Sequence, residues 1–189
     1  MGELFELISD NAIKKLDTYY TECHVCGKTE VDLYPYQGQV ILDNGEIDDD
    51  IYAICYDCLC TKPMTRVCSF PYEEVVEKYL GSLNLAQDHK AELRITLMEK
   101  YNRTPDIPLF IQRPDIPLCC EDITEFTGYP QNDKELYEVS EQLMYWEEGP
   151  KERSEYDDFK TYGSPESLTE IATFKCPHCD RKYFTFQFT

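Results

Sequence analysis

Cysteines separated by two residues occur three times in this chain, and this spacing constrains the fold more than any other feature. The pairs are Cys23 with Cys26, Cys55 with Cys58, and Cys176 with Cys179. Two cysteines at this spacing can direct both sulfurs at one metal ion, and backbone N–H groups after the first cysteine support the thiolates. Each pair therefore predicts half of a tetrahedral metal site.

The first two pairs predict one complete zinc site, because C-x2-C, a spacer of hairpin length and a second C-x2-C are typical of structural zinc. The predicted ligands are Cys23, Cys26, Cys55 and Cys58. Gly27 follows the first pair, as a tight knuckle requires. Cys60 is an alternative for the fourth position, and Cys68 is expected in the core. The competing interpretation is that some of these thiols are ordinary small buried side chains.

The third pair predicts half of a second zinc site, which the adjacent Cys119 and Cys120 could complete. Neighbouring residues of a strand point to opposite faces, so both can bind one ion only if the backbone bends there. His178 or a carboxylate is the alternative fourth ligand. The order Cys-Pro-His-Cys also occurs in dithiol oxidants, but a redox pair needs a helix after its first thiolate, and here an alternating strand follows.

The charge of the chain bears on its partners. The chain has 37 acidic and 18 basic residues and a formal charge of -19. A continuous positive face that neutralises nucleic-acid phosphates is therefore not expected. An acidic surface accelerates encounters with a cationic partner, although solubility alone is a sufficient reason for such a charge.

The cysteine content also bears on the compartment. No apolar stretch approaches the roughly 20 residues that cross a bilayer, and the first residues carry acids where a signal peptide carries Lys or Arg. A cytoplasmic location is expected. Ten cysteines in a reducing compartment are better explained by metal ligation than by disulfides.

Hydrophobic periodicity predicts an α+β fold, in which small zinc-ribbon or knuckle-like β-hairpin elements pack with several helices. The chain is expected to form a single domain, residues 1–189. Its expected regions are an amphipathic N-terminal helix in 1–18, a zinc-knuckle hairpin region in 19–68, a helical middle in 69–162 and a CxxC strand region in 163–189.

Within the helical middle, the pattern predicts three helices and an acidic segment. The first is capped by Ser69 and broken by Gly81, the second stops near Thr104, and the third covers 135–146. The acidic segment, 133–158, includes a charged loop after Gly149. It is longer than a connecting loop requires.

Several motifs follow one another in this chain, and their order is more specific for a protein family than any one of them alone. They are Cys23-x2-Cys26-Gly27, Cys55-x2-Cys58, Arg103-Thr104-Pro105, Cys119-Cys120-Glu121-Asp122 with Phe126 and Gly128, Gly163-Ser164-Pro165, and Phe174-Lys175-Cys176-x2-Cys179. Over roughly residues 20 to 188, this order resembles the bacterial CbrC family. A His-Cys pair is usual in that family where this chain has Cys119 and Cys120, and the resemblance implies a metal role at this position.

The CbrC family is linked by name to tolerance of a DNase colicin, so the resemblance implies a defence or immunity-like role. The leading hypothesis is a non-enzymatic cytoplasmic zinc protein that binds a cationic protein such as a basic toxin. No catalytic residues are predicted, since the three histidines form no His-rich set. The alternatives are a zinc-dependent enzyme or stress factor with one open site, and a nucleic-acid-binding zinc ribbon, which the motif favours and the charge opposes.

Overall fold

The fold was analysed in a computed structural model, which describes residues 5–17, 19–36, 39–61, 64–65, 72–104, 116–147, 149–151 and 171–186. The strands are β1 (Leu33–Pro35), β2 (Gln39–Ile41), β3 (Ile47–Asp48), β4 (Ala53–Cys55), β5 (Met64–Thr65), β6 (Leu118–Cys119), β7 (Asp122–Ile123), β8 (Glu125–Gly128), β9 (Met144–Tyr145), β10 (Ile171–Lys175) and β11 (Lys182–Phe186). The helices are the 3-10 turn η1 (Asp10–Ala12), α1 (Tyr56–Thr61), α2 (Tyr72–Ser82), α3 (Gln87–Asn102) and α4 (Asp133–Gln142). The fold is α+β, as predicted.

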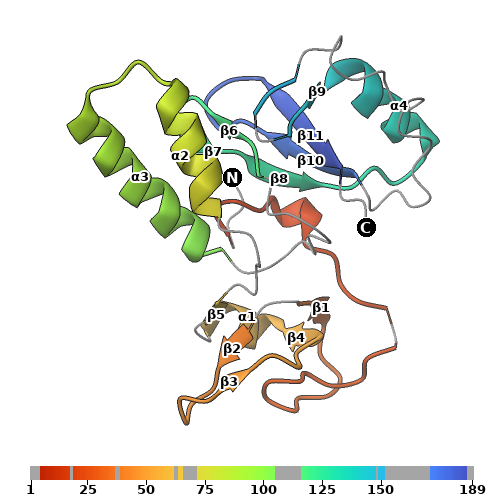
Figure 1. Cartoon of the computed structure of the whole chain (residues 1–189). Helices are drawn as coiled ribbons and strands as arrows, with labels where there is room; N and C mark the ends of the chain where they lie inside the picture. Colours follow the sequence, from red (N-terminus) through yellow and green to blue (C-terminus); the bar gives the residue numbers. More distant parts are fainter. Residues whose placement is uncertain are drawn as a thin grey trace.

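The elements form two groups in space. Figure 1 shows β1 to β5 with α1 in the lower group, and α2 to α4 with β6 to β11 in the upper group. A single cluster of buried side chains contains members of both, including Ile54 from the lower group and Phe126 from the upper group. Each group also carries one of the cysteine constellations described below.

The upper group is built on a four-stranded sheet in the order β8-β10-β11-β9. β10 and β11 pair antiparallel over five residues, from Ile171 opposite Phe186 to Lys175 opposite Lys182. The alternation that predicts a strand near the chain end therefore corresponds to β11. α4 packs Val139 against Ile171 and Phe184 of this sheet. The β10–β11 hairpin presents Cys176 and Cys179 at its turn.

In the lower group, β1 and β4 pair antiparallel, and Leu33 lies opposite Cys55. The two strands expected between the cysteine pairs are therefore partners. They do not form a simple hairpin, because β2 and β3 lie between them in the chain and form a hairpin of their own. Its turn is closed by the N–H of Leu42, which donates to the carbonyl of Glu46 at 2.8 Å.

Two of the helices expected in the middle of the chain are present as α2 and α3. Tyr72 of α2 and Tyr101 of α3 stack with ring centroids 4.3 Å apart, which holds the helix pair together. Gly81 does not break α2, which continues to Ser82. The predicted cap Ser69 lies outside the described residues.

The predicted N-terminal helix in 1–18 is wrong for the described residues 5–17, where the only helical turn is η1. This segment instead pairs with the upper sheet. The N–H of Phe126 donates to the carbonyl of Leu7 at 2.8 Å, and the N–H of Ser9 donates to the carbonyl of Phe126 at 2.9 Å. These bonds bury Leu7 and Ile8. Tertiary pairing thus satisfies the backbone that an isolated helix would satisfy locally.

The prediction of a helical middle over 69–162 is also only partly right, because β6, β7 and β8 lie inside it. The third helix, predicted over 135–146, is α4 and ends at Gln142. Residues 144–145 form β9, which pairs parallel to β11, so a sheet edge competes successfully with the helical pattern. α4 occupies the first part of the acidic segment 133–158, and residues 152–158 lie outside the described part of the chain.

Candidate metal centres

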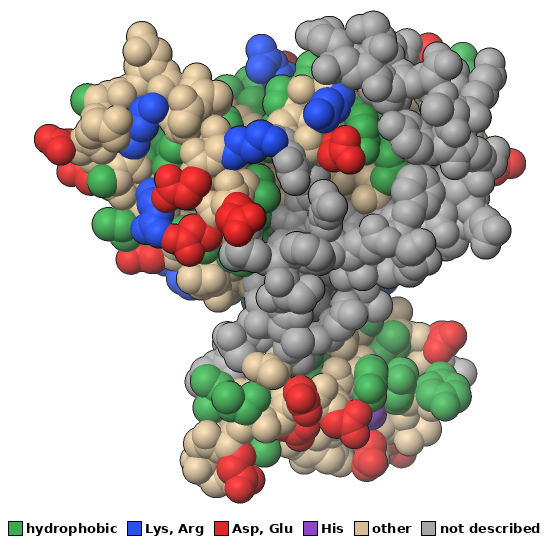
Figure 2. All heavy atoms as spheres, in the orientation of Figure 1, with side chains coloured by type: hydrophobic (Ala, Val, Ile, Leu, Met, Phe, Trp, Pro, Cys, Tyr) green, Lys and Arg blue, Asp and Glu red, His purple; other side chains and the backbone are tan. Residues whose placement is uncertain are grey.

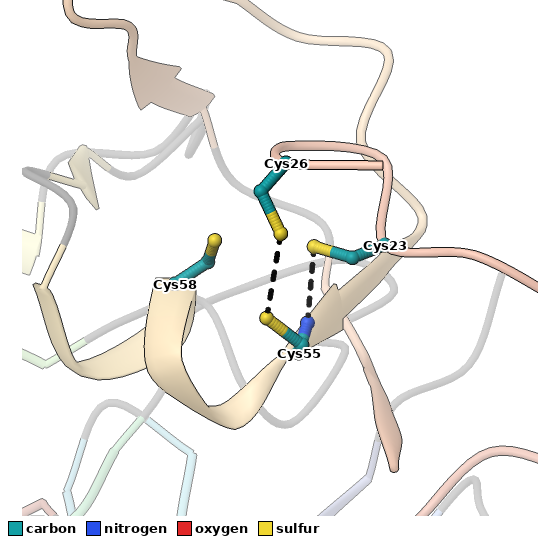
Figure 3. Close-up of side chains that lie close together, drawn as sticks. All are labelled: Cys23, Cys26, Cys55 and Cys58. Atoms are coloured by element: carbon teal, nitrogen blue, oxygen red, sulfur yellow. Dashed lines mark hydrogen bonds between the residues drawn. The ribbon is translucent and has the colours of Figure 1, made fainter. Parts of the chain in front are cut away.

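The first cysteine group, called site 1, contains Cys23, Cys26, Cys55 and Cys58. Its first half is a knuckle at Cys23–Gly27. The N–H of Cys23 donates to the carbonyl of Lys28 at 2.9 Å, and the N–H of Gly27 donates to the carbonyl of Cys23 at 2.8 Å. Gly27 has φ +67°, a left-handed conformation that glycine adopts without steric cost. The predicted knuckle glycine is therefore required by the backbone, and the turn presents the sulfurs of Cys23 and Cys26 on one side (Figure 3).

The second half of site 1 lies where β4 passes directly into α1. Cys55 is the last residue of β4, and Cys58 lies in the first turn of α1. The N–H of Cys55 donates to the sulfur of Cys23 at 3.3 Å, which joins the two halves. Figure 3 shows the four sulfurs directed at a common centre between the knuckle and the start of the helix.

The four sulfurs of site 1 all lie within 4.8 Å of one another, close enough to hold one metal ion. Three of these cysteines are buried and Cys26 is exposed. Cys60, the alternative for the fourth position, is exposed on α1 and lies outside this group. Cys68, expected in the core, is not among the described residues.

The second cysteine group, called site 2, contains Cys119, Cys120, Cys176 and Cys179. Its first half lies at the turn between β10 and β11 and shares one backbone hydrogen bond with the knuckle of site 1. The N–H of Cys176 donates to the carbonyl of Arg181 at 2.9 Å, five residues further on, as Cys23 does to Lys28. The N–H of His178 donates to the sulfur of Cys176 at 3.4 Å. Backbone N–H groups that point at a sulfur stabilise its thiolate form.

The second half of site 2 is the β6–β7 hairpin, whose two turn residues are Cys120 and Glu121. Both have left-handed backbones, with φ +53° and +62°. This is the bend that two adjacent cysteine ligands require, and it costs roughly 1–2 kcal/mol per residue for side chains other than glycine. The N–H of Glu121 donates to the hydroxyl of Tyr79 at 2.8 Å, which supports the turn.

Site 2 consequently contains both adjacent cysteines. The sulfurs of Cys119, Cys120, Cys176 and Cys179 all lie within 4.8 Å of one another. His178, the alternative ligand, is not part of this group. Its Nε2 lies 2.8 Å from Oδ2 of Asp122 instead. The histidine therefore fastens the knuckle to the hairpin that carries the other two cysteines.

Asp122 also connects site 2 to α3. Its Oδ1 accepts a hydrogen bond from Nζ of Lys100 at 2.6 Å, and Lys100 contacts Glu6 at 3.0 Å. The side chains of Lys100 and Asp122 are only 11% and 14% exposed. Sequence reasoning missed this network, because the residues lie far apart in the chain. The one available signal is that Asp122 follows two cysteines in a segment already singled out.

The pKa values of the thiols differ within each group. Burial, together with Cys26 and Cys55 nearby, raises the pKa of Cys58, and burial raises the pKa of Cys119 to about 12 although the Tyr183 hydroxyl opposes this. Burial also acts on Cys23, but backbone N–H groups, that of Cys55 first, outweigh it and lower its pKa to about 7. The backbone of Arg181 lowers the pKa of Cys179 to about 7.

Metal uptake is expected to depend steeply on pH, because metal ligands are thiolates while Cys58 and Cys119 hold their protons at pH 7 without metal. The pKa is raised for two thiols in each group, so each bound ion should displace about two protons and affinity should fall about a hundredfold for each pH unit of acidification. Proton release can be followed with an indicator dye, and affinity by chelator competition at about pH 6 and about pH 8. Equal affinities at the two pH values would contradict four-thiolate ligation.

None of the protein-family models, curated proteins or solved structures compared with this chain matches it. None of the described helices combines the length and the hydropathy of a membrane-spanning segment. The nine described cysteines all carry free thiols. Within the described residues, the two cysteine groups are the side-chain clusters that could hold a metal ion.

Proposed function

We propose that this chain is a cytoplasmic zinc protein without catalytic activity, in which two closed tetracysteine sites hold the fold and an acidic surface binds a cationic protein. The observation that carries the proposal is the spacing of the sulfurs. Zinc bonds sulfur at about 2.3 Å, which places the sulfurs of a tetrahedral site about 3.8 Å apart. The Cys26–Cys55 and Cys119–Cys120 sulfurs are both 3.8 Å apart, and the Cys119–Cys179 sulfurs are 3.7 Å apart.

These distances favour metal ligation over the other states of paired cysteines. Disulfide sulfurs lie about 2.04 Å apart, so the measured spacings are far too long for disulfides. Zinc with four thiolates has a complete tetrahedron and no open position for a substrate or an activated water. The four sulfurs of each group thus support a structural role and weigh against the proposal of a zinc-dependent enzyme.

A cation lies beside each site, at the equivalent position of each knuckle. Lys28 accepts the knuckle hydrogen bond at site 1 through its carbonyl, and Arg181 does so at site 2. A zinc ion with four thiolates carries a net charge of about -2, so a neighbouring cation stabilises the loaded site. The side chain of Lys28 also pairs with Asp57 of α1 at 2.8 Å, which links the two halves of site 1.

The proposed partner is a cationic protein, and the resemblance to the CbrC family points to the basic nuclease domain of a toxin. A formal charge of -19 favours attraction of such a domain through long-range steering. The same charge weighs against the alternative of a nucleic-acid-binding zinc ribbon. The cytoplasm, where thiols stay reduced, suits nine described cysteines with free thiols.

The zinc part of the proposal is tested by metal stoichiometry and cobalt substitution. The purified protein should contain two zinc ions per chain, and Co²⁺ in their place should give the absorption bands of tetrahedral cobalt with four thiolates. Cys60→Ser is the matched control, because this exposed cysteine lies outside both groups and its loss should leave two equivalents. A single equivalent, or a cobalt spectrum with oxygen ligands, would overturn the assignment.

The partner part is tested with a panel of purified basic toxin nuclease domains and the zinc-loaded full chain. Calorimetry should detect binding to at least one of these domains. In a separate kinetic measurement, the association rate of that complex should fall as salt is added. Protection of cells against the same toxin should follow from expression of the chain. If no basic toxin binds and none is tolerated, this part of the proposal fails while the zinc part stands.

A further inference from the structure

Four aromatic rings form a continuous row on the surface of the lower group, next to site 1. Tyr19 contacts Tyr20 with ring centroids 4.9 Å apart, Tyr20 contacts His24 at 5.2 Å, and His24 contacts Tyr52 at 6.2 Å. Every contact is edge-to-face, with interplanar angles between 75° and 86°. In this geometry the edge of one ring meets the face of its neighbour. The three contacts join all four rings.

The two ends of the row are exposed, and Tyr20 between them packs against the core. Tyr19 is 81% exposed and Tyr52 is 54% exposed, while Tyr20 and His24 are half-buried. Isolated exposed aromatics are common on protein surfaces, but a contiguous set of four is the kind of patch that marks an interaction site. The two end residues are thus accessible to a partner.

Site 1 supplies the framework of the row. His24 lies between the ligands Cys23 and Cys26, and its N–H donates to the carbonyl of Ala53 in β4 at 2.9 Å. The N–H of Tyr52 donates to Nδ1 of His24 at 3.3 Å. These bonds tie the knuckle to the segment that ends in Cys55. An ion in site 1 that holds the knuckle against β4 therefore also holds the row in place.

The surroundings of the row are strongly acidic. Residues 19–61 contain nine acidic residues and one lysine, Lys28, which is paired with Asp57, while Lys15, just before this range, is paired with Asp32. At the end of the row, the carboxylate of Asp50 raises the pKa of Tyr52 through its charge and a hydrogen bond, and Asp49 adds to this. In the lower part of Figure 2, hydrophobic side chains and a histidine lie beside acidic side chains on one face.

We infer that the row of Tyr19, Tyr20, His24 and Tyr52 is the docking surface for arginine side chains of a basic protein segment. The exposed faces of the tyrosine rings attract a guanidinium through cation–π interaction, and the neighbouring carboxylates attract the same charge. This inference rests on the proposed function, because it names the surface that meets the cationic partner. It also makes docking depend on the metal in site 1.

The inference is tested with an oligoarginine peptide and the zinc-loaded full chain, by calorimetry at low and high salt. Two double variants separate the ring faces from the rest of the side chains. Tyr19→Leu with Tyr52→Leu removes both faces, whereas Tyr19→Phe with Tyr52→Phe keeps them. Tyr137→Leu is the matched control, because Tyr137 is 67% exposed on the acidic helix α4, away from the row. Two zinc equivalents in each variant will show that the fold is intact.

The leucine pair should weaken peptide binding about tenfold, since each exposed cation–π contact contributes roughly 0.5–1 kcal/mol. The phenylalanine pair should bind within about twofold of wild type, and so should the Tyr137 control. Equal binding by wild type and the leucine pair, an equal loss in the control, or no binding to wild type would each overturn the inference.

The toxin panel separates failure of this inference from failure of the proposed function. If a basic toxin binds wild type and the leucine pair equally well, the docking surface is wrong and the proposed function stands. If the peptide discriminates between the variants as expected but no toxin binds, the docking surface stands and the toxin is the wrong partner. Cys26→Ser, which removes a sulfur of site 1, should weaken peptide binding at least as much as the leucine pair if metal organises the row.

Discussion

Replacement of Cys55 by serine should unfold the lower group and release one of the two zinc ions. Structural zinc contributes on the order of 10 kcal/mol in small zinc domains, which is comparable to the whole stability of a typical protein. Cys55 is the residue where this loss should be greatest, because its buried sulfur belongs to site 1 and its N–H supports the sulfur of Cys23. Serine at this position replaces a soft ligand with a hydroxyl that zinc binds weakly.

The measurements for this variant are zinc content and amide hydrogen exchange across β1, β4 and α1. Protection should be lost there, and zinc should fall from two equivalents to one. Cys60→Ser is again the matched control, since it makes the same chemical change in α1 at an exposed cysteine outside the site. Two equivalents of zinc and unchanged melting in Cys55→Ser would show that site 1 does not hold this part of the fold.

Replacement of Asp122 by alanine should destabilise the protein by about 3 kcal/mol, because it leaves the nearly buried Lys100 with Glu6 as its one ion-pair partner among the described residues. The same change removes the carboxylate that holds Nε2 of His178 in the knuckle of site 2. The variant should therefore also lose metal from site 2 faster than wild type. At other metal sites, removal of a supporting hydrogen bond weakens metal binding. Denaturant unfolding and cobalt dissociation measure the two effects.

A double-mutant cycle with Lys100→Met separates this ion pair from general damage to the hairpin. If the buried charge is responsible, Asp122→Ala with Lys100→Met should be more stable than Asp122→Ala alone. Glu77→Ala is the matched control, because Glu77 pairs with Arg94 on an exposed helix surface, where such pairs contribute less than about 1 kcal/mol. Equal effects of Asp122→Ala and Glu77→Ala would contradict the role given to the Lys100 network.

Residue spacing alone predicted the features that depend on local chemistry. The interval between Cys23 and Cys26 and the glycine after them define a knuckle, because the chain can close this turn only in a few ways. The 3.6-residue period predicted α2 and α3, and the two-residue period predicted β11, since each pattern records which side chains are buried. These inferences need no knowledge of what lies on the other side of the buried face.

Tertiary structure decided the features that depend on a distant partner. Residues 5–17 have a helical pattern, yet Leu7 and Ser9 pair with Phe126, because β8 lies at the edge of its sheet and its outer backbone groups need partners. Tyr145 likewise joins the edge of β11 and does not extend α4. The pattern shows that these residues are apolar, but it does not show which backbone lies next to them.

The two cysteine sites also differ in how far the sequence alone predicted them. Site 1 followed from spacing, because both of its halves are C-x2-C units. For the second half of site 2 the sequence offered Cys119 and Cys120 but left His178 as an alternative, because the two adjacent sulfurs meet only through a left-handed turn that neither residue type favours. The contact between His178 and Asp122, across 56 positions of the chain, was equally hidden. Sequence therefore determined which residues could be ligands, and the packing of β6 and β7 against the β10–β11 turn decided which of them meet.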